Sequence, residues 1–171
     1  KKMTLRARNL DGKPIKVNDK DGNPILIGLV VVWRLKDAYK ALFEVDLQEK
    51  ETKTVNTRMN ALERFVSIQS DAALRQVAGQ YSYDNIDEEA KSGEITLRSG
   101  GDEINEELVK KLTERLSMAG IEVIEARINN LNYAPEIAAA MLRRQQASAV
   151  VSAREKIVEG AVSMVKMALD K

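Results

Sequence analysis

Residues 25–35 read ILIGLVVVWRL, and this stretch is the strongest indication of the fold. Its odd-numbered positions, from Ile25 to Leu35, are all apolar. Its even-numbered positions are apolar or Gly from Leu26 to Val32 and become charged at Arg34. This alternation predicts a long β-strand that begins buried on both faces and ends half-exposed. The apolar run at 25–33 is too short for a transmembrane helix, which needs about 20 residues.

Two turn signals lie within residues 3–36, which read as strands throughout. Asp11-Gly12 separates two strand-like runs, a pattern typical of a two-residue β-hairpin. A second cluster of turn residues, DKDGNP at 19–24, leads into the long strand. We therefore expect three strands joined by short turns in an antiparallel meander.

The second turn also resembles the start of a calcium-binding loop. Asp19, Asp21 and Asn23 occupy alternate positions, as the first ligands of such a loop do. However, the sixth position of that loop needs Gly and is Pro24 here, and the twelfth needs Glu and is Val30. A hairpin turn is therefore the better interpretation, and we predict no metal site.

Helical spacing follows the strand-like region. We expect a short helix that is capped by Asp37 and ends at Phe43, followed by helices over 47–66 and 70–79. A loop over 82–101 comes next. A further helix runs from a cap at Asp102 to Ala119, and Gly120 ends it. A strand, IEVIEARINNLNY at 121–133, comes next. The sequence therefore predicts the α+β class, with helices packed on an antiparallel or mixed sheet.

The last part of the chain predicts one long helix. Pro135 suits a first helical position, and from Glu136 to Leu169 there is no further Pro and one Gly. Such a helix is about 50 Å long, which exceeds what a compact domain of this size covers. We therefore divide the chain into a core domain at 1–134 and a helical segment at 135–171.

Residues spaced by heptads predict an oligomerisation or partner-binding surface on this helix. From Val151 onward, small and β-branched residues form a seam interrupted by one Arg. The predicted interface consists of Val151, Arg154, Val158, Ala161, Val162, Val165, Ala168 and Leu169. Such a seam needs a partner, because an isolated helix gains little stability in water. The alternative is that the helix folds back on its own domain.

Composition excludes several kinds of chemistry. The 171-residue chain contains no Cys and no His, so it has no thiol nucleophile, no Ser-His-Asp triad, no Cys/His zinc site and no disulfide. Its formal net charge of +1 argues against a nucleic-acid partner bound through bulk electrostatics. We expect no nucleic-acid partner.

Charge is nevertheless uneven along the sequence. Residues 1–36 contain nine basic and three acidic residues. This basic third predicts a face toward anionic lipid headgroups, for which the first candidates are Lys1, Lys2, Arg6 and Arg8. The alternative interpretation is a solvated outer face of strands.

Two residue sets resemble parts of enzyme sites. Ser163 and Lys166 match the S-x-x-K spacing of serine acyl-enzymes, but the order of the motifs is wrong and the helix is expected to be exposed. Paired acids occur at 88–89, 102–103 and 106–107, and those near residue 102 are better explained by a helix N-terminus. A Gly-rich phosphate loop is also absent. We therefore predict no enzymatic activity and no cofactor.

Four stretches together resemble the SPFH family, also called the band-7 domain, which includes stomatin, prohibitin, flotillin and a bacterial protease-regulating pair. They are VNDKDGNPILIGLVVVWRLKDAYKALFEV at 17–45, ALRQVAGQYSYDNI at 73–86, INEELVKKLTERLSMAGIEVIEARINNL at 104–131 and YAPEIAAAMLRRQQASAVVSAREK at 133–156. The last is carried by Pro135, Glu136, Ile137, Met141, Gln145, Ala149 and Glu155. The resemblance extends from about Leu5 to Ala161.

This resemblance implies a non-enzymatic membrane scaffold that forms homo-oligomers and organises membrane microdomains. The alternative that it implies is an adaptor that binds and regulates a membrane protease or channel. Family members usually carry an N-terminal membrane anchor. Since the sequence begins Lys1-Lys2 rather than with Met, we expect a soluble fragment whose upstream anchor was removed.

Overall fold

The computed structural model describes residues 3–43, 55–85 and 94–170. Internal contacts divide the chain into two compact units. The first comprises Lys1–Asp84 with Ile95–Ala134, and the second comprises Asn85–Glu94 with Pro135–Lys171. Each unit is described by itself below.

The first unit is built on a four-stranded antiparallel sheet with β3 at its centre. The strands are β1 (Arg8–Asp11), β2 (Ile15–Asn18), β3 (Pro24–Leu35) and β4 (Ile121–Tyr133). β4 pairs with β3 along almost its whole length, from Ile25 opposite Tyr133 to Leu35 opposite Ile121. The predicted α+β class and the predicted bounds of β4 are confirmed.

The predicted meander is wrong at its first turn. β1 and β2 do not pair with each other; they follow one another along β3, β1 opposite Val30–Trp33 and β2 opposite Pro24–Ile27. Gly12 continues the ladder, since its amide donates to the carbonyl of Leu29 at 2.9 Å. Pro14 then interrupts it, because proline has no amide hydrogen to donate. Asp11-Gly12 therefore continues the strand path along β3 and does not form a hairpin, and the interruption comes at Pro14.

The second predicted turn is confirmed between β2 and β3. The buried carboxylate of Asp19 accepts hydrogen bonds from the backbone amides of Asp21 at 3.0 Å and Asn23 at 2.8 Å. Gly22 has φ +83°, a left-handed conformation that glycine adopts without steric cost. Asp19 therefore stabilises the turn between β2 and β3, which agrees with its prediction as a hairpin residue.

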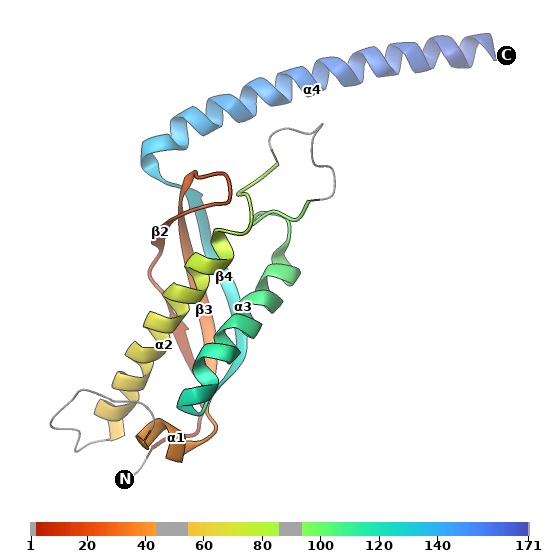
Figure 1. Cartoon of the computed structure of the whole chain (residues 1–171). Coiled ribbons are helices and arrows are strands. Elements are labelled where there is room, and N and C mark those ends of the chain that lie inside the picture. The colour runs from red at the N-terminus through yellow and green to blue at the C-terminus, as the bar shows by residue number, and fades with distance from the viewer. Residues whose placement is uncertain (1–2, 44–54, 86–93, 171) are drawn as a thin grey trace. The chain divides into compact units, whose positions relative to one another are not determined.

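Two helices cover one face of the sheet (Figure 1). The helical elements of this unit are α1 (Ala38–Phe43), α2 (Val55–Ala78), α3 (Gly101–Leu116) and the short 3₁₀ turn η1 (Ser117–Ala119). α3 packs mainly on β4 and α2, and α2 also contacts β2 and β3. The core lies between this helical layer and the sheet, where the side chain of Trp33 is completely buried.

The helix ends agree in part with the prediction. Asp37 caps α1, since its Oδ1 accepts from the amides of Tyr39 at 2.9 Å and Lys40 at 3.3 Å. Gly120 ends η1 with φ +65°, as expected. The predicted cap of α3 is wrong: Gly100 is the N-cap, and Asp102 lies within the first turn. A side chain at position 100 would collide with Ile95, 2.0 Å away, so the close approach requires glycine.

One predicted helix boundary is also wrong. The helices expected at 47–66 and 70–79 form a single helix in the described region, α2, which runs without a break from Val55 to Ala78. Residues 47–54 lie outside the described residues. The expected apolar stripe is present, since Met59, Leu62 and Val66 are buried.

The second unit contains α4 (Pro135–Leu169), which has 35 residues. It begins at the predicted proline and runs through Gly160 to the predicted end. The predicted C-terminal helix is therefore confirmed.

Candidate functional site

All eight residues of the predicted interface lie on α4 and are exposed. Val158 exposes 61% of its surface and Leu169 exposes 80%. Large aliphatic side chains stabilise a protein by roughly 1.5–3 kcal/mol each when they are fully buried. α4 therefore carries apolar surface whose burial by a partner would be favourable.

These residues belong to a wider apolar surface, which we call the α4 apolar face. At 3.6 residues per turn, one broad side of the helix from residue 150 onward holds nearly all of its apolar side chains. The face consists of Val150, Val151, Ile157, Val158, Ala161, Val162, Met164, Val165, Ala168 and Leu169. Prediction from the sequence alone omitted Val150, Ile157 and Met164, which flank the seam and expose 52%, 72% and 63% of their surface. Their regular seven-residue spacing was the signal that could have identified them.

The opposite side of α4 is polar and has balanced charges. It holds Ser152, Glu155, Lys156, Glu159, Ser163 and Lys166. Two of these are acidic and two are basic. A helix that lies in a membrane interface instead has a polar side rich in Lys and Arg. The charge pattern of α4 favours a protein partner over a lipid surface.

Ser163 and Lys166, the residues with S-x-x-K spacing, lie on this polar side and are exposed. A lysine serves as a general base near neutral pH when burial lowers its pKa. Neither side chain has such surroundings on α4. Their S-x-x-K spacing is therefore explained by helix surface composition.

In the core unit, a shallow groove of about 470 Å³ lies between α3 and β4. It is lined by Asp102, Asn105, Glu106, Val109, Lys110, Ile124, Glu125, Ala126 and Arg127. Ile124 is half-exposed there because it is the extra residue of a β-bulge opposite Val32 and Trp33. Asn105 accepts a hydrogen bond from the amide of Ile128 at 3.4 Å, and this bond joins α3 to the middle of β4. The groove was not among the predicted sites, and its one signal in the sequence is Ile124, an apolar residue that breaks the alternation of β4.

The acidic pairs at 102–103 and 106–107 lie on α3. Asp102 and Glu103 lie in the first turn of α3, where the helix dipole favours negative charge. Glu107 accepts a 2.5 Å hydrogen bond from the hydroxyl of Tyr81, and this bond raises the pKa of Tyr81. The pair at 88–89 lies outside the described residues.

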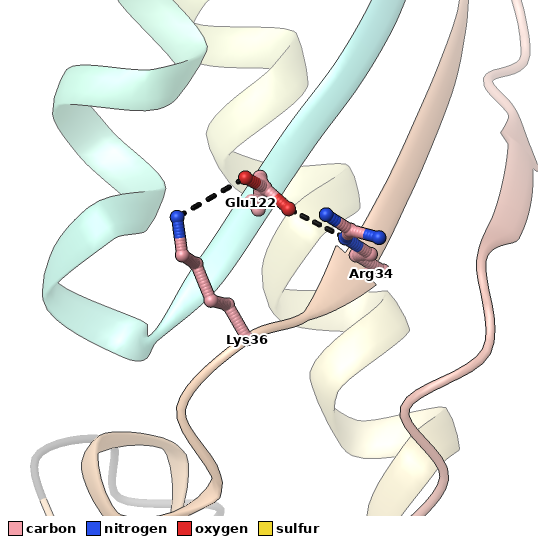
Figure 2. Close-up of polar contacts among 3 residues, drawn as sticks. All are labelled: Arg34, Lys36 and Glu122. Carbon is pink, nitrogen blue, oxygen red and sulfur yellow. Dashed lines mark hydrogen bonds and ion pairs between the residues drawn. The ribbon is translucent and has the colours of Figure 1, made fainter.

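Several cations of the basic N-terminal third pair with acids of the core. Figure 2 shows Glu122 of β4 between Arg34 and Lys36, with its carboxylate 2.5 Å from Arg34 Nε and 3.2 Å from Lys36 Nζ. Arg8 pairs with Glu63 of α2 at 2.8 Å. Arg8, Arg34 and Lys36, three of the nine basic residues in this third, are therefore paired with carboxylates of the core unit.

The predicted lipid-facing residues remain a prediction. Arg6 is exposed, whereas Arg8 is half-buried beside Glu63. Lys1 and Lys2 lie outside the described residues. Among the described residues, no helix is long and apolar enough to cross a bilayer.

Tyr83 and Tyr133 contact each other in the core unit, next to the turn that Asp19 stabilises. The rings of Tyr83 and Tyr133 stack with centroids 3.9 Å apart, and the hydroxyl of Tyr133 donates to Asp84 at 3.0 Å. Burial, followed by the charge of Asp84, raises the pKa of Tyr133 well above its ordinary value. The hydroxyl of Tyr133 therefore stays protonated and serves as a hydrogen-bond donor in this cluster.

The chain matches a known protein family. The sequence model described as the SPFH domain / Band 7 family matches residues 2–161. No curated protein matches the chain significantly. The matched range includes the whole described core unit and most of α4.

Proposed function

This chain belongs to the SPFH domain / Band 7 family, and we propose on that premise that it is a non-enzymatic, membrane-associated scaffold. In this proposal, copies of the chain assemble through the α4 apolar face and organise membrane microdomains. The family is generally one of membrane-associated scaffolds without enzymatic activity, which supports the scaffold role and the lack of enzymatic activity. The proposal includes a membrane anchor upstream of Lys1, which would hold the assembly at the membrane.

The α4 apolar face is the observation that carries the proposal. Its side chains are exposed, and the polar side of the helix has no excess of positive charge that would direct it to lipid. A face this wide suits a bundle in which a helix touches more than one neighbour, because a two-stranded coil needs only a narrow seam.

Replacing three seam residues tests the proposal. Val151→Asp, Val158→Asp and Val165→Asp together place three charges where another copy would pack, so we expect a monomer with a folded core. Sedimentation equilibrium measures the mass, and the fluorescence of Trp33 reports the fold of the core. The matched control is Ser152→Asp, Lys156→Gln and Ser163→Asp, which makes the same change in net charge on the polar side of α4. Assembly that survives the seam substitutions would place the interface elsewhere.

An adaptor that restrains a membrane protease or channel remains a second candidate function. The same α4 apolar face favours it, since a helix of a client protein would cover that face as well as a second copy does. Co-purification from membranes of the native source distinguishes the two functions. A scaffold returns the chain bound to itself, whereas an adaptor returns a stoichiometric membrane protein whose binding the three Val→Asp substitutions abolish.

A further inference from the structure

Arg154 is the one charged residue in the middle of the α4 apolar face. The residues three and four positions away along the helix are Val150, Val151, Ile157 and Val158. These are the positions that side chains contact on a helix surface, so α4 offers no carboxylate to Arg154 at helical spacing. When another molecule covers this face, the guanidinium loses water and needs a carboxylate from that molecule.

The heptad positions indicate where that carboxylate comes from. With Val151 and Val158 at position a, Arg154 occupies position d and Glu155 occupies position e. In two helices that run in the same direction and in register, a d side chain faces the d side chain of its neighbour and packs beside that neighbour's e side chain. Arg154 of one copy then faces Arg154 of the next and lies beside its Glu155, whose carboxylate offsets the repulsion between the two guanidinium groups. In two helices of opposite direction, position d instead faces position a, which is Val at 151, 158 and 165.

We propose that α4 helices of neighbouring copies pack in the same direction and in register, with Arg154 of one copy paired to Glu155 of the next. The inference rests on the self-assembly proposed above and adds its orientation and the residues that fix it. A lone Arg in an apolar seam lowers the stability of the assembly, and in return it disfavours every register that leaves the charge unpaired.

The balanced charge of α4 makes a second copy the favoured occupant. Glu155 adjoins the apolar face, where anionic headgroups would repel it, whereas Arg154 of another copy would attract it. The same helix therefore supplies both members of the pair.

Charge reversal tests the pairing in the 171-residue chain. Arg154→Glu alone and Glu155→Arg alone each place like charges together across the seam, and we expect either variant to assemble roughly tenfold more weakly or worse. A mixture of the two variants restores opposite charges between unlike copies, and we expect it to recover assembly. The matched control, Lys156→Glu with Glu159→Arg, reverses charges on the polar side and should leave assembly unchanged.

A single cysteine tests the direction, because the chain contains no other Cys. Under mild oxidation we expect Val158→Cys to form a disulfide between position 158 of two copies. Cross-linking of Val158→Cys copies only to copies that carry a cysteine at a d position, such as Ala161→Cys, would show the opposite direction and overturn the inference.

The outcomes separate this inference from the proposed function. Normal assembly of Arg154→Glu, or a mixture that fails to recover, would overturn the pairing and leave self-assembly in place. An unmodified chain that stays monomeric would overturn both.

Discussion

At the scale of single residues, Gly28 shows how closely β3 and β4 fit together. Asn129 is the extra residue of a second β-bulge in β4, and its side chain donates to Asp11 of β1 at 2.8 Å. A Cβ atom at position 28 would lie 2.5 Å from Asn129 Oδ1 and 3.2 Å from Cβ of Asn130. Glycine at this position therefore leaves room for a hydrogen bond that joins β4 to β1.

Gly28→Ala should lower the free energy of unfolding by about 1–3 kcal/mol, because an extra methyl group forces its packed neighbours to move. Urea unfolding, followed by the fluorescence of the single buried Trp33, measures the change. The matched control is Gly101→Ala, where an added Cβ meets nothing within 4 Å. Equal stability of the two variants would contradict this explanation of Gly28.

Glu122 gives the fold a dependence on pH. Hydrogen bonds from Arg34, then from Lys36, lower the pKa of Glu122 below its ordinary value of 4.5. Since the folded-state pKa lies below the unfolded one, folding favours the ionised carboxylate. This stabilisation is complete above about pH 4.5 and is lost as the pH falls through the folded-state pKa.

Glu122→Gln should therefore show a smaller loss of stability than the unmodified chain between roughly pH 5 and pH 2. Urea unfolding across this range gives the two curves, and Glu114→Gln, at an exposed position on α3, serves as the control. Parallel curves for the unmodified chain and Glu122→Gln would show that the ion pairs of Glu122 add no stability.

At the scale of elements, local patterns predicted most of the fold. The alternation at 25–35 predicted β3, and the runs after Gly120 and Pro135 predicted β4 and α4. The β1–β2 hairpin was wrong because Asp-Gly signals a turn but cannot show which strand each run pairs with. That choice depends on β3, whose length accommodates both short strands in succession.

One residue, Ser70, explains why two helices were predicted where α2 is continuous. Ser70 takes the place in the apolar stripe that follows Val66, so the sequence shows polarity where a helix would continue to bury its face. The structure buries Ser70 to 5% exposure, and its hydroxyl has no hydrogen-bond partner among the described residues. Tertiary packing thus overrides the local pattern.

Ser70→Ala should stabilise the chain by roughly 1 kcal/mol, since it removes a buried unpartnered hydroxyl and improves helix propensity. The midpoint of urea unfolding measures this gain. Ser67→Ala, at a half-exposed position of the same helix, should give the propensity effect alone. A loss of stability in Ser70→Ala would mean that the hydroxyl has a partner.

The candidate site was predictable because it depends on sequence periodicity in one helix. The seam from Val151 to Leu169 follows from heptad spacing, and its exposure agrees with the expectation of a surface helix. The groove between α3 and β4 was not predictable in the same way. It depends on a bulge at Ile124, and bulges arise from the pairing of two strands 90 or so residues apart.

At the scale of the whole molecule, the basic N-terminal third has partners in the later acidic part of the sequence. Glu63 binds Arg8, and Glu122 binds Arg34 and Lys36. The uneven charge along the chain is therefore partly balanced within the core unit. Among the described residues, most of the large apolar side chains that remain exposed lie on α4.

The concentration dependence of the mass of the unmodified chain tests this account most directly. If the α4 apolar face joins copies of the chain, sedimentation equilibrium should show an average mass that rises with concentration well above the 19.1 kDa of one chain. A mass that stays at 19.1 kDa up to high concentration would contradict self-assembly through α4.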